Sequence, residues 1–189
     1  MYYDTFDPFL ALTAMASVTK KLKVGTGICL VVERDPIVTA KEVATLDVMS
    51  GGRFLFGIGG GWNIEEMENH GTESSTRFKR MRESVEAMRV IWAEDPAEYH
   101  GDVIDFDPIH LSPKPISPPP VHIGGGSPHG ARRAASYGNG WIPIGGRDGD
   151  PLDHVVTLRE ECEKVGRDPS EVELSSYFGP TDPAEIERL

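Results

Sequence analysis

Apolar residues recur along this chain with two alternating patterns, one typical of helices and one typical of buried strands. Spacings of three and four residues predict helices over 8–19, 37–49, 75–93, 128–137 and 152–165. A nearly continuous apolar run rich in β-branched residues predicts a strand covered on both faces over 22–32. Further strands are predicted over 53–58, 121–123, 141–144 and 172–177. Strand and helix alternate about five times with short connections, which predicts an α/β protein with parallel strands and right-handed crossovers.

Five dipeptides place a capping side chain before a proline suited to the first position of a helix. They are Asp7-Pro8, Asp35-Pro36, Ser127-Pro128, Asp150-Pro151 and Asp182-Pro183. They signal helix starts without choosing an architecture. A doubly wound open sheet and part of an eight-unit barrel both satisfy the alternation.

One segment interrupts the alternation. Residues 94–120 are acidic, aromatic and proline-rich, with no sustained helical period. We interpret them as an excursion that contains a short hairpin at 99–106 and covers the functional site. Nothing else resembles a linker, so residues 1–189 are expected to form a single domain.

Two glycine clusters follow predicted strands, where parallel α/β folds place their sites. The first, Gly59-Gly60-Gly61-Trp62, precedes the acidic pair Glu65 and Glu66, and its glycines would let a flat ligand approach the backbone. The alternative interpretation is a tight turn in which Trp62 provides local packing.

The second cluster, Gly124-Gly125-Gly126-Ser127, directly precedes a predicted helix that contains Arg132 and Arg133. Exposed amides, the positive end of a helix dipole and a hydroxyl suit a phosphate monoester. The alternative is a capped helix after a glycine turn. We expect the two arginines to be surface charges rather than phosphate ligands.

Other reactive side chains give weaker signals. The six histidines have no metal-ligand spacing, so no metal site is expected. His122 lies within an apolar strand, which suits a core residue and a site residue equally well. Cys29 is predicted to be a core residue, and no residue could be assigned as catalytic.

Composition limits the partners. The chain has 19 basic and 30 acidic residues, a formal net charge of −11, which opposes nucleic acid and anionic membranes as general partners. No apolar run approaches the roughly 20 residues that span a bilayer. Two cysteines in unrelated contexts fit a reducing compartment, so a cytoplasmic location is expected.

The order of several motifs resembles the bacterial luciferase-like monooxygenases, with the branch that uses the deazaflavin coenzyme F-420 as the nearest match and FMN-dependent relatives as the alternative. The motifs cover nearly the whole chain. They include Gly25–Ile28, Asp35–Lys41, Thr45–Asp47, Ser50–Phe54, Gly57–Trp62, Arg80–Trp92, Ser112–Pro115, Pro119-Pro120, Gly124–Ser127 and Gly140-Trp141.

The resemblance implies a partial TIM barrel, hydride transfer between the cofactor and a small organic substrate, and a set of cofactor-binding residues. Gly27 and Ile28 would lie behind the cofactor ring, often across a non-proline cis peptide. Gly60, Gly61, Trp62 and Glu66 would line its edge. The phosphate would bind to Gly124, Gly125, Gly126 and Ser127.

Family members carry about two further strand–helix units before the position of Met1 and one beyond Leu189, which implies a barrel incomplete at both ends. The first strands of the family supply the residues usually assigned to proton transfer. A non-catalytic cofactor-binding or assembly protein and, less favoured, a doubly wound phosphate binder are therefore alternatives to the enzyme. Unpaired strand edges predict a homo-oligomer.

Overall fold

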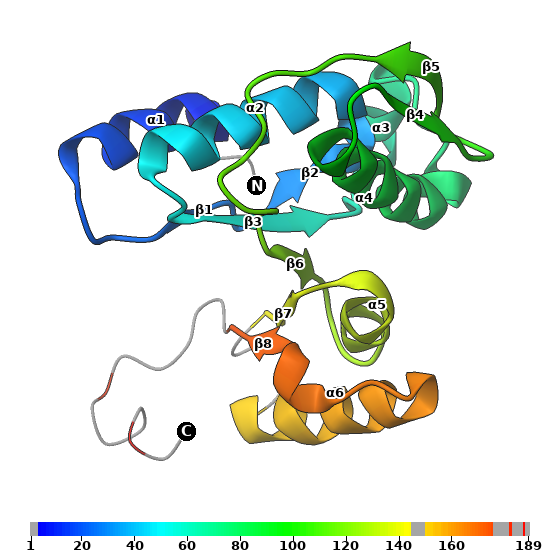
Figure 1. Cartoon of the computed structure of the whole chain (residues 1–189). Coiled ribbons are helices and arrows are strands. Elements are labelled where there is room, and N and C mark those ends of the chain that lie inside the picture. Colours follow the sequence, from blue (N-terminus) through cyan, green and yellow to red (C-terminus); the bar gives the residue numbers. More distant parts are fainter. Residues whose placement is uncertain (1–3, 145–149, 176–181, 183–186, 188–189) are drawn as a thin grey trace. The chain divides into compact units, whose positions relative to one another are not determined.

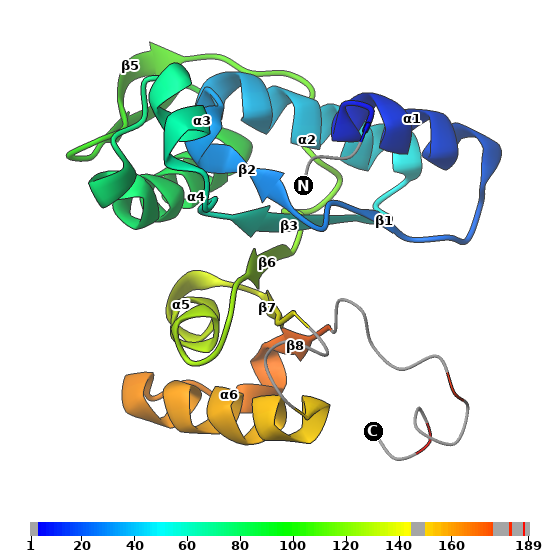
Figure 2. The same ribbon diagram turned by 180° about the vertical axis from the view of Figure 1, so that it is seen from behind.

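The computed structural model describes residues 4–144, 150–175, 182 and 187. The chain divides into two compact units, Met1–Pro119 and Pro120–Leu189, and each is described by itself. Figures 1 and 2 show their helices and strands from opposite sides. Whether the chain behaves as a single domain stays a prediction.

Unit 1 is built around three short parallel strands. β3 (Phe54–Gly59) pairs with both β1 (Val24–Gly25) and β2 (Cys29–Leu30). Its helices are α1 (Pro8–Val18), α2 (Pro36–Ser50), α3 (Ile64–Asn69) and α4 (Arg77–Ala93). Along unit 1, strands and helices alternate as predicted from the sequence (Figure 1).

The prediction of one continuous strand over 22–32 is wrong. Val24 pairs with Phe54 but Cys29 pairs with Ile58, so the register slips by one residue and the strand breaks between β1 and β2. Residues Val31–Glu33 then form a 3-10 helix. Apolar composition could not reveal the break, because Val31 and Val32 are buried in the 3-10 helix just as they would be in a strand.

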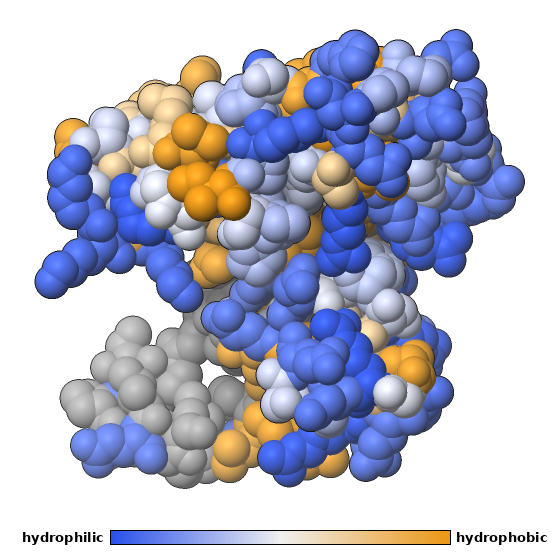
Figure 3. All heavy atoms as spheres, viewed as in Figure 1, coloured by the Kyte–Doolittle hydropathy of each residue, from blue (hydrophilic) through white to orange (hydrophobic). Residues whose placement is uncertain are grey.

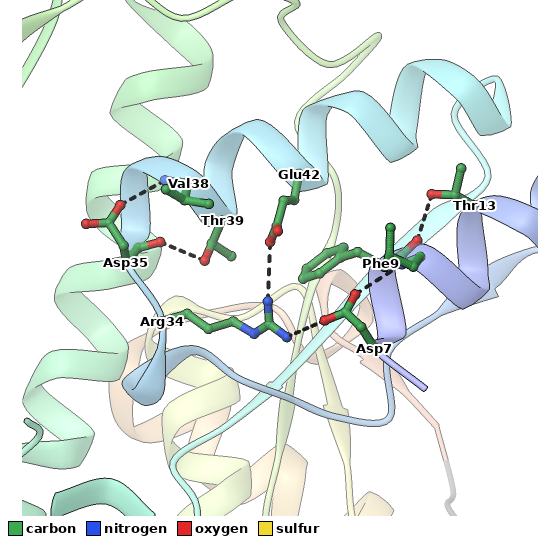
Figure 4. Close-up of polar contacts among 9 residues, drawn as sticks. Asp7, Phe9, Thr13, Arg34, Asp35, Val38, Thr39 and Glu42 are labelled. Carbon is green, nitrogen blue, oxygen red and sulfur yellow. Dashed lines mark hydrogen bonds and ion pairs between the residues drawn. The ribbon is translucent and has the colours of Figure 1, made fainter. Parts of the chain in front are cut away.

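Aspartate caps begin two helices of unit 1 as predicted. Asp7 accepts a hydrogen bond from the Leu10 amide at 3.1 Å, and Asp35 accepts one from the Val38 amide at 2.8 Å. Figure 4 shows that Arg34 lies between Asp7 and Glu42, at 2.9 and 3.4 Å. This ion-pair network joins the start of α1 to α2.

The core of unit 1 lies where α1, α2 and α4 meet the strands. Phe9, Phe54 and Phe56 are buried, with ring centroids 6.0–6.4 Å apart. Other apolar side chains remain at the surface over α1 and α2 (Figure 3). Leu10 and Val18 are 75% and 82% exposed.

Residues 94–120 contain the predicted hairpin, which is confirmed. β4 (Ala97–His100) and β5 (Asp105–Ile109) pair antiparallel, with Tyr99 opposite Phe106. The Glu83 carboxylate of α4 accepts hydrogen bonds from the amides of Val103 and Ile104, which attaches the hairpin to this helix. The prediction that this segment covers a site is not tested by these contacts.

Unit 2 contains three further parallel strands. β7 (Gly140–Ile142) pairs with β6 (Val121–Gly124) on one side and with β8 (Glu173–Leu174) on the other. Its helices are α5 (His129–Tyr137) and α6 (Pro151–Val165), and Asp150 caps α6 as predicted. The predicted strand over 172–177 and the helix signal at Asp182-Pro183 extend outside the described residues.

The predicted cap at Ser127 is wrong. The N-cap of α5 is Pro128, without a side-chain cap hydrogen bond. The carbonyl of Gly126 instead accepts the Gly130 amide at 2.8 Å. The backbone therefore closes the first turn.

Candidate functional site

Most of the predicted ring-binding residues of unit 1 lie at one edge of its strands. Leu30 pairs with Gly59, so β2 and β3 end side by side, and Gly60, Gly61 and Trp62 follow directly. Because carboxyl ends of parallel strands carry the sites of such folds, this edge is the candidate site of unit 1. The Gly27–Ile28 peptide bond, just before β2, is cis, as the resemblance led us to expect.

At the first two glycines of this edge, side chains from elsewhere in the protein occupy the space that a Cβ atom would need. A Cβ atom at Gly59 would lie 2.5 Å from Cδ1 of Ile28, and one at Gly60 would lie 2.7 Å from Cε1 of Phe78. The sequence analysis predicts that these glycines let a flat ligand approach the backbone, and this stays a prediction. In the structure the glycines also bring Ile28 and Phe78 against the end of β3, so these two side chains form the surface beside the strand.

The two interpretations of Trp62 are contact with a flat ligand and local packing in a tight turn. Its side chain is 76% exposed, at the end of the loop that Gly61 turns with a φ of +69°. An indole exposed beside a strand end is suited to stack on a planar ligand.

Glu66 lies on α3, a helix that the sequence analysis did not predict. Asn63 caps this helix through the Glu66 amide, and the apolar residue Met67 is buried beneath it. The outer face is polar. An open pocket of about 300 Å³ lies there, lined by Asn63, Glu65, Glu66, Asn69 and His70.

Glu33 is a further candidate site residue, which the sequence analysis missed. It is half-buried in the 3-10 helix after β2, with Oε1 3.6 Å from the Cβ position of Gly61. Burial raises the pKa of the Glu33 carboxyl, and the negative charge of Glu66 raises that pKa further. Its position just after an apolar strand was the signal that could have identified it.

The predicted phosphate loop of unit 2 follows β6. Gly124, Gly125 and Gly126 are half-buried, and Ser127 is exposed. Gly125 has a φ of +143°, which L side chains rarely adopt, so glycine is required there. The Gly125 carbonyl accepts a hydrogen bond from the Trp141 indole at 2.8 Å.

Both arginines of α5 contact other groups of unit 2. Arg132 is exposed, and its Nε lies 3.2 Å from a carboxylate oxygen of Glu161. Arg133 donates a hydrogen bond to the His129 carbonyl within the same helix.

His122 and Cys29 are buried. His122 is 2% exposed on β6, and a Cβ atom at Gly140 would lie 2.6 Å from its Nδ1. This packing favours the core interpretation of His122. Burial raises the pKa of the Cys29 thiol to about 12, which suits a core residue.

Two properties of the described residues bear on the class of function. Histidine, cysteine and acidic side chains there form no group of three or more that could hold a metal ion. None of the helices within 4–144 and 150–175 has the length and apolar character needed to cross a membrane.

Known proteins match nearly the whole chain. The profile of the luciferase-like monooxygenase family matches residues 1–181. An uncharacterised protein of Mycobacterium tuberculosis is 38% identical over 169 residues, which cover 88% of this chain and 60% of that protein. An F420-dependent glucose-6-phosphate dehydrogenase of Amycolatopsis mediterranei is 32% identical over 140 residues, or 72% and 42% of the two chains.

Solved structures match as well. An F420-dependent secondary alcohol dehydrogenase, solved with an F420-acetone adduct, has a TM-score of 0.79 at 27% identity, over 91% of this chain and 54% of that one. A monooxygenase from Streptomyces bottropensis has a TM-score of 0.79 at 25% identity, over 96% and 58%. This chain thus spans about 60% or less of the length of these relatives.

The structural neighbours are luciferase-like TIM-barrel enzymes. The prediction of a partial barrel with parallel strands is therefore confirmed, and the doubly wound alternative is wrong. Neither unit closes a barrel with its own described strands.

Proposed function

The chain belongs to the luciferase-like monooxygenase family, and we propose that it binds a flavin-type cofactor and takes part in hydride transfer between that cofactor and a small organic substrate. Coenzyme F-420 is the favoured cofactor, because the named dehydrogenase relative and a structural neighbour at 27% identity are F420-dependent. FMN is the alternative, since a diketocamphane monooxygenase from Pseudomonas putida with the same fold was solved with FMN.

One observation carries the proposal: an exposed indole and a half-buried Ile28 lie beside the strand ends of unit 1. The edge fits a planar ring, because Trp62 presents an exposed indole and Ile28 presents an apolar surface against Gly59. The glycine loop of unit 2 fits a phosphate, because it combines backbone amides with the start of α5. We assign the ring to Gly27, Ile28, Gly60, Gly61, Trp62 and Glu66, and the phosphate to Gly124–Ser127.

The cofactor, when bound, supplies the hydride chemistry, and the chain supplies binding, orientation and electrostatics. Trp62 would stack on the ring and exclude water from one part of it. Glu33 is our candidate for moving a proton, because its carboxylate Oε1 lies 3.6 Å from the Cβ position of Gly61 at this edge, and burial raises its pKa. A non-catalytic cofactor-binding protein remains the second candidate, since it needs the same binding residues without a proton donor.

Cofactor binding is tested by titrating the chain with coenzyme F-420, FMN and riboflavin and following fluorescence. We expect Trp62→Ala to weaken ring binding about three- to tenfold. Met49→Ala is the matched control, because Met49 is also an exposed apolar residue, 55% exposed, but lies near the end of α2. Equal affinities of wild type and Trp62→Ala would contradict the ring assignment.

Turnover separates the two candidates. Anaerobic mixing with the reduced cofactor and a panel of enones and quinones, followed by absorbance, measures hydride transfer directly. Turnover above the rate of free cofactor, and reduced by Glu33→Gln, would support the enzyme. Binding without such turnover would support the non-catalytic protein.

We further propose that the chain is cytoplasmic and forms homo-oligomers. The exposed apolar side chains of α1 support self-association, because water disfavours a contiguous apolar surface. The net charge of −11 supports the absence of nucleic acid and anionic membranes among its partners.

A further inference from the structure

Trp141 of β7 contacts the glycine loop through a partly buried hydrogen bond. Its side chain is fully buried, and its indole Nε1 donates to the Gly125 carbonyl at 2.8 Å. The Gly125 amide in turn donates to the Ile142 carbonyl at 3.3 Å. The carbonyl and the amide of Gly125 are therefore both hydrogen-bonded to adjacent residues of β7.

This arrangement fixes the direction of the next amide. The peptide bond between Gly125 and Gly126 is trans, and a planar trans peptide directs its carbonyl and its N–H to opposite sides. Because the Gly125 carbonyl is directed at buried Trp141, the Gly126 N–H is directed away from it. No backbone carbonyl of the described residues accepts the amides of Gly126 or Ser127.

Close packing holds the indole in this position. A Cβ atom at Gly130 would lie 2.2 Å from the Gly125 carbonyl oxygen and 2.5 Å from Nε1 of Trp141, so only glycine fits beside this hydrogen bond. On α6, His154 packs edge-on against Trp141, with ring centroids 5.3 Å apart. The α5 and α6 helices therefore limit the movement of the indole.

We infer that Trp141 is a positioning residue for phosphate recognition: by holding the Gly125 carbonyl inward, its indole N–H keeps the Gly126 N–H directed outward at the phosphate. This inference rests on the proposed assignment of the phosphate to Gly124–Ser127. Trp141 itself need not touch the ligand. Its loss should reduce recognition of the phosphate and leave recognition of the ring unchanged.

The test compares ligands that differ in the phosphate. FMN and riboflavin form one pair, and coenzyme F-420 and its phosphate-free deazariboflavin portion form the other. Trp141→Phe keeps an aromatic ring but removes the N–H. Trp92→Phe is the matched control, because Trp92 is also buried and donates its indole N–H to a backbone carbonyl, that of Ala40, at 3.0 Å.

In each pair, we expect wild type to bind the phosphate-bearing ligand more tightly than the phosphate-free ligand. The factor between these two affinities should be the same in Trp92→Phe as in wild type. In Trp141→Phe that factor should fall about five- to tenfold, as expected for one hydrogen bond, while affinity for the phosphate-free ligand stays within about twofold. An unchanged factor in Trp141→Phe would overturn the inference. A parallel loss of affinity for both ligands would overturn it too, since it would indicate a merely structural role.

Two results keep this test separate from the proposed function. If wild type does not distinguish the two ligands of either pair, the phosphate assignment fails, and the inference fails with it. If Trp141→Phe does not fold, benzothienylalanine at position 141 replaces the N–H by sulfur in a ring of nearly the same shape. The expected loss of phosphate preference, and the results that contradict it, are then the same.

Discussion

Replacing Glu83 by alanine should release the β4–β5 hairpin from α4. The Glu83 side chain is 3% exposed, and its Oε2 accepts the amides of Val103 and Ile104 at 2.7 and 3.0 Å. Hydrogen bonds to a charged group contribute about 1.5–3 kcal/mol each. Because Glu83→Ala removes the acceptor of both, we expect the free energy of unfolding to fall by about 3 kcal/mol.

Urea unfolding and amide hydrogen exchange measure this effect. Exchange should accelerate most at the amides of Val103 and Ile104. Glu83→Gln keeps an acceptor oxygen but loses the charge, so about half of the destabilisation is expected. Glu160→Ala, at an exposed position of α6, is the control and should stay within about 0.5 kcal/mol of wild type.

The same contact predicts a pH dependence. Burial acts to raise the pKa of Glu83, but the hydrogen bonds from Ile104 and Val103 outweigh it, and the pKa is lowered. A lowered pKa stabilises the folded chain fully above the unfolded pKa of about 4.3, and this stabilisation is lost as the pH falls through the lowered value. The stability difference between wild type and Glu83→Gln should therefore shrink below about pH 4.

Two results would refute this reasoning. One is a loss below about 1 kcal/mol in Glu83→Ala together with unchanged exchange at Val103 and Ile104. The other is a difference between wild type and Glu83→Gln that does not vary between neutral and acidic pH.

Three further predictions concern ligand binding, thiol chemistry and assembly. Gly126→Asp should place a carboxylate against the phosphate and weaken binding of coenzyme F-420 or FMN at least about thirtyfold without unfolding the chain; equal affinities in titration would remove the assignment. Cys29, whose thiol pKa burial raises to about 12, should resist maleimide at pH 8 until the chain is unfolded, and rapid labelling of the native protein would contradict its burial. Wild type should self-associate in light scattering across a concentration series, and Leu10→Lys with Val18→Glu should reduce this; a monomer at all concentrations in wild type would contradict the prediction.

Local signals predicted most helices of the fold. Asp7, Asp35 and Asp150 start helices because each side chain accepts an amide of the first turn, an interaction that needs no distant partner. The helix predicted from the apolar period over 75–93 is confirmed as α4, although its first two residues, Ser75 and Thr76, belong to the 3-10 helix Ser74–Thr76.

Predictions failed where the local pattern of residue types does not determine the structure. The break between β1 and β2 depends on which residues of β3 they meet, and no pattern within 22–32 contains that information. The short α3 was missed because six residues with one buried side chain, Met67, carry almost no periodicity. Ser127 does not cap α5, because the Gly130 amide donates its hydrogen bond to the Gly126 carbonyl.

The two glycine clusters share a composition but differ in what their glycines do. Gly59 and Gly60 are small because Ile28 and Phe78 occupy the space beside them, so that cluster contributes the surface of other side chains to a site. Gly125 is required because its φ is +143°, whereas the nearby Gly130 is required because a Cβ atom there would lie 2.2 Å from the Gly125 carbonyl oxygen. That oxygen accepts the Trp141 indole N–H, and this hydrogen bond directs the Gly126 amide outward. Ring recognition should therefore depend on side chains such as Trp62, and phosphate recognition on the backbone. Substitutions at the first cluster should change which ring is bound, whereas substitutions around the second should change only whether a phosphate adds to affinity.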